Sequence, residues 1–227
     1  IKDIMDRQTN PTLALYAKTG EVLLRITASS ENKIECEEMI NRQLEEIERR
    51  EGVGEYIYLV GDENISSSQT ELNTVVANLL IENNYTISIA ESLTGGEIVS
   101  MLVEKSGISN SLLEGVVCYS NKSKITTLGV KEETLEKFGA VSEEVAREMA
   151  LGVAKRLNSD FAIATTGIAG PNSDESGKPV GLVYIAIYAQ GEVTVKECLF
   201  VGDRDLIRFR ASVEALDEVR KNILKKL

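Results

Sequence analysis

Apolar and polar residues follow short regular patterns through the first 62 positions. Two alternating segments flank a Gly-containing turn and predict a β-hairpin. An amphipathic helix with an acidic face and a short β-rich run are expected after it. In chain order these four segments are 12–18, 21–28, 32–50 and 56–60. Residues 1–62 are therefore expected to form a small β-β-α-β unit of the α+β class.

A different pattern begins after a polar stretch, 63–69, that lacks periodicity and predicts a linker. From residue 70 to 227, strand-like and helix-like segments alternate, which predicts an α/β domain with three α/β/α layers. The last two strands form a predicted hairpin around Gln190-Gly191, so the sheet is expected to be mixed. The expected strands are 86–90, 114–119, 160–165, 180–189 and 192–200. The expected helices include 94–104, one or two within 121–138, one capped by Ser142, and one from about 205.

Composition narrows the function classes. The chain has 227 residues, a net charge of −11 and no histidine. Excess negative charge disfavours nucleic acid and anionic membranes as partners. The absence of histidine excludes a Ser-His-Asp triad and imidazole metal ligands, and three scattered cysteines are too few for a thiolate zinc site. We expect no metal, no cofactor and a cytoplasmic protein, and a chain that starts at Ile1 is expected to be part of a longer one.

Two segments have the composition of a ligand site, and each directly follows a predicted strand. Residues 91–96 combine two hydroxyl side chains with Gly95 and Gly96, which suits an anion cradle of backbone N–H groups or an ordinary helix cap. Residues 165–171 (TTGIAGP) leave the backbone open to a bound molecule. In open α/β sheets ligands bind beyond the carboxyl ends of strands. Both segments are therefore candidate binding loops.

A third segment carries a possible nucleophile and base. Ser109 precedes the run Tyr119-Ser120-Asn121-Lys122-Ser123-Lys124. Without histidine, a serine nucleophile needs another base, and a buried lysine serves when its pKa is depressed. Spacing alone does not choose between Lys122 and Lys124. Further on, Arg204 of Gly202-Asp203-Arg204 is a candidate for phosphate binding or for pairing with an aspartate.

The order of these motifs is more specific than any one of them. The series AESLTGG, GISNS, CYSNKSK, GAVS, TGIAGP, KPVG and GDR, from about residue 70 to the end, resembles the C-terminal domain of the CinA family, which also occurs alone as nicotinamide-nucleotide amidase. Residues 1–62 resemble the KH-like middle domain of that family. The family's N-terminal domain, similar to molybdopterin-binding proteins, has no counterpart in this sequence.

The resemblance implies hydrolysis of nicotinamide mononucleotide to nicotinic acid mononucleotide and ammonia, in pyridine-nucleotide salvage. By motif, Ser109 corresponds to the nucleophile, Lys124 to its base and Tyr119 to an active-site tyrosine. The same correspondence gives the binding residues Ser92, Thr94, Gly95, Gly96, Thr166, Gly167 and Arg204. The chemistry of amide hydrolysis agrees, and Thr166 or the N–H groups around Gly167 are expected to hold the oxyanion. The family also implies a homodimer.

A second hypothesis assigns the same fold to a protein that binds a ligand or partner but catalyses no reaction. Here the domain is a non-catalytic nucleotide-sensing or protein-interaction module, as the family's link to competence and DNA damage suggests. RNA binding by residues 1–62 is disfavoured, because they hold 13 acids against 8 bases and no G-x-x-G loop between two helices. Ammonia release from nicotinamide mononucleotide distinguishes the two hypotheses.

Overall fold

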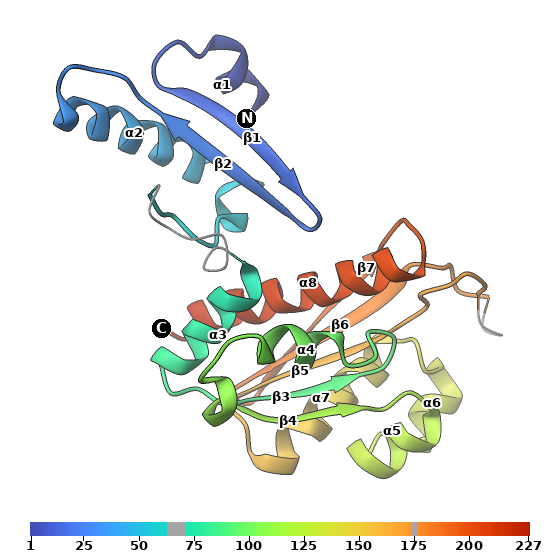
Figure 1. Ribbon diagram of the computed structural model, residues 1–227. Coiled ribbons are helices and arrows are strands. Elements are labelled where there is room, and N and C mark those ends of the chain that lie inside the picture. The colour runs from blue at the N-terminus through green and yellow to red at the C-terminus, as the bar shows by residue number, and fades with distance from the viewer. Residues whose placement is uncertain (63–70, 174–176) are drawn as a thin grey trace. The chain divides into compact units, whose positions relative to one another are not determined.

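The structure, a computed structural model, describes residues 1–62, 71–173 and 177–227. The chain divides into two compact units, Ile1–Asn64 and Ile65–Leu227 (Figure 1). The predicted linker 63–69 lies outside the described residues.

The N-terminal unit is a hairpin packed with two helices. Its elements are α1 (Lys2–Arg7), β1 (Thr12–Lys18), β2 (Glu21–Thr27), α2 (Lys33–Glu48) and η1 (Gly54–Tyr56). The hairpin is antiparallel, as predicted, with Thr12 opposite Thr27 and Lys18 opposite Glu21. Ile4, Leu13 and Ile47 form its buried centre. Helix α1 was not part of the sequence-based prediction, and its one buried residue, Ile4, explains why a short helix forms there.

The predicted strand over 56–60 is wrong. Residues 54–56 form the 3₁₀ helix η1, and residues 57–60 have no regular structure. The apolar side chains of Val53 and Ile57 pack against the core of this unit. The apolar run therefore reflects burial, and it adds no third strand to the hairpin.

The second unit is built on a five-stranded mixed sheet, as the sequence predicted. Its strands are β3 (Ile87–Glu91), β4 (Leu112–Val117), β5 (Phe161–Gly167), β6 (Leu182–Ala189) and β7 (Glu192–Leu199). Their order across the sheet is β4-β3-β5-β6-β7. β3 runs parallel to β4 and β5, and β6 and β7 complete the sheet in antiparallel pairs. The carboxyl ends of β3, β4 and β5 consequently meet at one edge.

Helices cover both faces of this sheet, which confirms the three-layer architecture. α3 (Leu72–Glu82), α4 (Glu97–Val103) and α8 (Arg204–Leu224) lie on one face (Figure 1). α5 (Asn121–Leu128), α6 (Glu132–Phe138) and α7 (Glu143–Leu157) lie on the other. The predicted cap of α7 is confirmed, since the Ser142 hydroxyl accepts the Val145 N–H.

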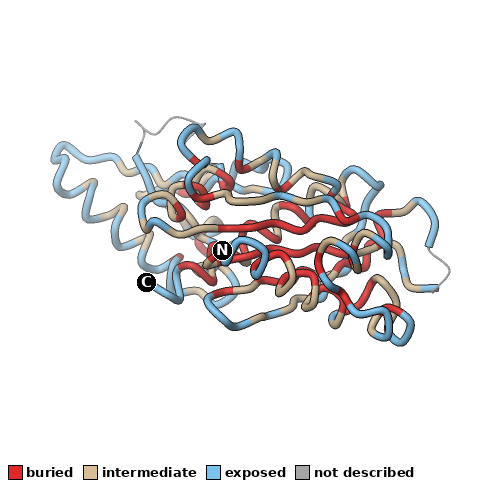
Figure 2. Tube along the Cα trace, turned by 90° about the horizontal axis from the view of Figure 1, so that it is seen from below, coloured by how far each residue is buried: buried red, intermediate tan, exposed pale blue. Residues whose placement is uncertain are grey.

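The three inner strands of the sheet, β3, β5 and β6, form the buried centre of the second unit, and Figure 2 shows continuous red stretches there. All of β3 is buried, and β5 is buried through Thr166. Strands covered on both faces consist mostly of apolar residues, so the polar side chains at their ends stand out. None of the helices in the described part of the chain has the length and apolar character needed to cross a membrane.

Candidate active site

A cavity of about 360 Å³ opens where β3, β4 and β5 end. Ser92 directly follows β3, Tyr119 comes two residues after β4, and Thr166 and Gly167 end β5. Parallel strands bring these separate segments to one edge, which is where open α/β sheets bind ligands. The described residues that line the cavity are Ser92, Leu93, Tyr119, Asn121, Lys124, Ala140, Val141, Thr166, Gly167, Ile168, Ala169, Gly170, Asn172, Ser173 and Arg204.

Lys124 is the buried cation of this cavity. It lies on the first turn of α5, and only 1% of its surface is exposed. Its Nζ atom is 3.1 Å from the hydroxyl oxygen of Ser92 and donates to the carbonyl oxygens of Cys118 (3.0 Å) and Tyr119 (3.2 Å). Burial penalises the ammonium form and lowers the pKa of Lys124 to about 8. A substantial neutral fraction is therefore present near physiological pH.

The other lysine considered from the sequence, Lys122, is exposed. It is outside the set of described residues that line the cavity. Position on α5 thus settles the choice that spacing left open: Lys124 faces the cavity and Lys122 faces solvent.

Ser92 reaches Lys124 through the alternation of side chains along β3. Ser88 and Ala90 precede it on the same face, and Ala90 packs in the cluster formed with α7. The Ser92 N–H donates to the Thr165 carbonyl (3.1 Å), which continues the pairing of β3 with β5. The serine is thus held by the sheet itself, with its hydroxyl against the lysine.

Ser109 lies at the opposite edge of the sheet. It belongs to η3 (Ile108–Asn110), before β4 begins, and the following Ser111 carbonyl accepts the Ile87 N–H at the start of β3 (2.8 Å). The six residues of β4 then span ~20 Å before the chain reaches Tyr119. Ser109 does not line the cavity among the described residues. The prediction that Ser109 faces Lys124 is wrong, and Ser92 takes that place.

The glycine-rich start of α4 holds an internal anion. The carboxylate of Glu91, which is fully buried, accepts the N–H groups of Gly96 (2.9 Å), Ile98 (3.2 Å) and Val99 (3.0 Å). Gly95 and Gly96 have φ angles of 65° and 98°, a left-handed conformation that explains the glycines. Of the donors expected in the phosphate cradle at 94–96, the Gly96 N–H already binds Glu91, as do the next N–H groups of α4, so the start of this helix does not offer the predicted phosphate site.

The side chain of Thr94 is outside the set of described residues that line the cavity. Its hydroxyl is fully buried and lies 2.8 Å from the hydroxyl of Thr165. Thr94 thus joins the loop after β3 to the neighbouring strand β5. This hydroxyl contact is structural, and the predicted contact of the Thr94 side chain with substrate is not supported by this position.

Thr166 and Gly167 line the cavity as predicted, but the Thr166 hydroxyl is already engaged. It donates to the Ala140 carbonyl at 2.7 Å. With its proton used there, the side chain is not available to donate to an oxyanion. At Gly167 a Cβ atom would stand 2.7 Å from the Leu182 carbonyl oxygen, so only glycine fits between β5 and β6.

Tyr119 and Arg204 form the outer wall. The Arg204 guanidinium donates to the Gly170 carbonyl (2.6 Å) and lies 3.3 Å from the Tyr119 hydroxyl. Both side chains are exposed and line the cavity. No Asp or Glu is among the described residues that line it, although the chain carries a net charge of −11. The local electrostatics favour an anionic ligand at the Arg204 side.

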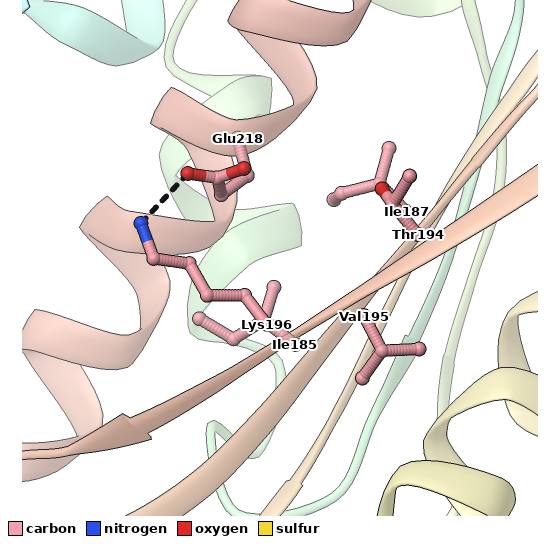
Figure 3. A pocket seen from close by; sticks show the side chains of 6 residues that line it. All are labelled: Ile185, Ile187, Thr194, Val195, Lys196 and Glu218. Carbon is pink, nitrogen blue, oxygen red and sulfur yellow. Dashed lines mark hydrogen bonds and ion pairs between the residues drawn. The ribbon is translucent and has the colours of Figure 1, made fainter.

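A second cavity of about 280 Å³ lies between β6, β7 and α8 (Figure 3). Its Lys196 extends toward α8 and donates to Glu218 (2.8 Å) and Glu214 (2.6 Å). Glu214, Asp217 and Glu218 lie near one another, and Lys221 bonds Asp217 at 2.7 Å. Protein cations therefore already compensate this acidic cluster.

Both units of the chain match models of a known protein family. The model of the CinA C-terminal domain matches residues 69–223, and the model of the damage-inducible protein CinA KH domain matches residues 1–58. The chain belongs to the CinA family. The CinA family match also supports the KH-like character predicted for the N-terminal unit.

Individual CinA relatives agree. A Clostridioides difficile protein whose name includes the words competence-damage inducible protein is 52% identical over 225 residues, which cover 99% of this chain and 53% of the relative. A CinA-like protein of Kosmotoga olearia is 50% identical over 224 residues, covering 99% and 52%. The chain thus spans about half the length of the curated relatives it matches.

Solved structures of CinA proteins match the fold. The competence/damage-inducible protein CihA of Agrobacterium tumefaciens shares 37% identity with a TM-score of 0.65, over 71% of this chain and 99% of that one. A CinA superfamily protein of Klebsiella pneumoniae shares 32% identity with a TM-score of 0.66, over 68% and 96%.

Proposed function

We propose that the second unit hydrolyses the carboxamide of nicotinamide mononucleotide to nicotinic acid mononucleotide and ammonia, with Ser92 as nucleophile and Lys124 as base. The observation that carries this proposal is the 3.1 Å contact between the buried Lys124 amine and the Ser92 hydroxyl. The substrate follows from the family resemblance. A cavity of this size, with cationic Arg204 and no carboxylate among its described lining residues, suits a small anionic molecule.

In the first half of the reaction, neutral Lys124 takes the hydroxyl proton as the Ser92 oxygen attacks the carboxamide carbon. A tetrahedral intermediate forms with the negative charge on the former carbonyl oxygen. The lysine ammonium then gives its proton to the departing nitrogen, so ammonia leaves and an ester to Ser92 remains.

In the second half, water attacks this ester and gives a proton to Lys124. The carbon–oxygen bond to Ser92 breaks, and the lysine returns the proton to the serine oxygen. The product is released as the carboxylic acid, which loses its proton to water and becomes the carboxylate of nicotinic acid mononucleotide. Every proton transfer uses the amine already in contact with Ser92, which supports the assignment of one residue to both halves.

The nucleotide phosphate is assigned to the outer wall of the cavity. Arg204 offers a guanidinium there, with Tyr119 beside it. Arginine binds phosphate oxygens through two parallel hydrogen bonds, and this supports the position. We also propose the homodimer and the cytoplasmic location implied by the resemblance, and no nucleic-acid partner for either unit.

The test is ammonia release from nicotinamide mononucleotide, with the acid product identified by chromatography. The unchanged protein is expected to be active, Ser92→Ala to lose at least ~10³-fold in kcat, and Ser109→Ala to stay within about two-fold. Ser109→Ala is the matched control because Ser109 lies across the sheet from the cavity. Binding of the nucleotide without any hydrolysis by the unchanged protein would contradict the proposal and favour a sensing module.

A further inference from the structure

The loop that follows Ser92 is hydrogen-bonded by the side chain of Arg208, which lies near the C-terminal end of the chain. Arg208, on the second turn of α8, is 115 residues from Leu93. Its Nε atom donates to the Leu93 carbonyl (3.1 Å), and its Nη2 atom donates to the Thr94 carbonyl (2.9 Å). One planar guanidinium thus binds two consecutive carbonyl groups of the loop.

Two backbone N–H groups of the same loop, those of Leu93 and Thr94, have no hydrogen-bond acceptor among the described residues. Leu93 is 4% exposed and Thr94 is fully buried, and buried backbone N–H groups without a partner are rare in folded proteins. Leu93 also lines the cavity. Unpaired donors directly after a nucleophile suit a negative charge that develops during the reaction.

Arg208 and these donors are linked by the geometry of the peptide group. In a trans peptide the carbonyl and the N–H point in opposite directions. A guanidinium that fixes the Leu93 carbonyl therefore turns the Thr94 N–H away from Arg208. Arg208 comes from α8, on the face of the sheet opposite α5, which carries Lys124. The freed N–H is thus directed away from the α8 side of the sheet.

We propose that Arg208 is a positioning residue that orients the peptide group between Leu93 and Thr94, so that the Thr94 N–H, together with the Leu93 N–H beside it, stabilises the oxyanion of the tetrahedral intermediate. This inference rests on the proposed function. The two N–H groups take the role that the sequence analysis gave to the Thr166 side chain, whose hydroxyl donates to the Ala140 carbonyl instead. The guanidinium also withdraws electron density through the Leu93 carbonyl, which strengthens the Thr94 N–H of the same peptide group as a donor.

The experiment compares Arg208→Lys with Arg210→Lys. Lysine keeps the charge but lacks the fork that binds two carbonyl groups at once. Arg210 is the matched control, because it is exposed on the same helix and its guanidinium donates to the Val201 carbonyl. For Arg208→Lys we expect kcat to fall ~10- to 10³-fold with KM within about three-fold, and for Arg210→Lys neither to change. The unfolding temperature of both variants is measured alongside, since a purely structural role predicts loss of stability and no split between kcat and KM.

A second measurement does not depend on the substrate. A fluorophosphonate reacts with a serine when its oxygen attacks phosphorus, fluoride leaves, and the hydroxyl proton passes to the base. The phosphoryl oxygen takes the position of the oxyanion, so Arg208→Lys is expected to be labelled at Ser92 at least ten-fold more slowly than Arg210→Lys. Labelling and hydrolysis at equal rates in the two variants would overturn the positioning role. Normal labelling of the unchanged protein without hydrolysis of nicotinamide mononucleotide would overturn the proposed substrate alone.

Discussion

The Nζ atom of Lys124 lies 3.1 Å from the hydroxyl oxygen of Ser92, although 32 residues separate them in the chain. Ser92 directly follows β3 and Lys124 lies on the first turn of α5, so both residues are at the edge of the sheet where the parallel strands end. The lysine has 1% of its surface exposed, and its hydrogen-bond partners among the described residues are hydroxyl and carbonyl oxygens. Burial without a compensating carboxylate is what makes an amine available as a base in a chain that has no histidine.

The rate of hydrolysis is expected to depend on the protonation of Lys124. Only the neutral amine accepts the serine proton, and burial lowers the pKa of Lys124 to about 8. The value of kcat/KM should therefore rise about ten-fold per pH unit below pH 8 and level off above it. A pH–rate profile measured between pH 6 and 9.5 checks this, and a flat profile across that range would argue against Lys124 as the base.

The same group makes stability depend on pH. The folded protein releases the Lys124 proton near pH 8, whereas the unfolded chain holds it up to about 10.5. Between these values the unfolded state binds more protons, so the free energy of unfolding rises with pH, by about 3 kcal/mol in total from this group. Other groups titrate in this range, so the quantity to measure is the difference between the unchanged protein and Lys124→Met in urea titrations. A difference that does not change from pH 7 to 10.5 would be inconsistent with the lowered pKa.

Glu91 is expected to stabilise the start of α4. Its carboxylate accepts three backbone N–H groups, and Glu91→Gln leaves one accepting oxygen and directs an NH₂ group at a donor. We expect the free energy of unfolding to fall by about 2–4 kcal/mol in chemical denaturation. Glu97→Gln is the control from the same turn, because within the described residues the Glu97 carboxylate accepts a single hydrogen bond, from Ser212 (3.2 Å). Burial raises the pKa of Glu97, so a neutral side chain suits its site. Equal losses in the two variants would show that Glu91 has no special capping role.

Arg204 is expected to recognise the phosphate and not the reacting amide. Arg204→Met should lower kcat/KM for nicotinamide mononucleotide by ~10- to 100-fold, as expected for the loss of a charge-assisted hydrogen bond. The riboside without the phosphate should be hydrolysed equally by both proteins. Steady-state kinetics with this pair of substrates separates the two effects. An equal loss for both substrates would instead assign Arg204 to holding the Tyr119 and Gly170 loops.

Much of the sheet and its helices could be predicted because their patterns are local. Alternation marked β1 and β2, and Ser142 marked the start of α7. The apolar run at 56–60 was misleading, since burial in a small core and pairing in a strand require the same residue types. Short helix α1 gave no signal of its own, because it is stabilised through Ile4 packing on the hairpin.

The sequence predicted which segments form the candidate site, but it did not predict which serine contacts the lysine. The composition of the sequence identified the loops after β3 and β5 and the candidate Arg204, and the family resemblance identified Lys124 and Tyr119. All of them contribute to the lining of one cavity. Which serine meets the lysine depends on where β4 begins and ends, and that places Ser109 and Ser92 at opposite edges. The strand boundary was the usable signal: Ser92 follows a strand, whereas Ser109 precedes one. Glu91 binds N–H groups at the start of α4 that lie five to eight residues after it, and the composition of this segment did not show that its own acid would occupy them.

The assignment of the nucleophile is tested most directly by rapid-quench mass spectrometry during turnover of nicotinamide mononucleotide. The account predicts an acyl group, the substrate minus ammonia, on the peptide that contains Ser92, and none in Ser92→Ala. An acyl group on the peptide that contains Ser109, or undiminished single-turnover hydrolysis by Ser92→Ala, would contradict it.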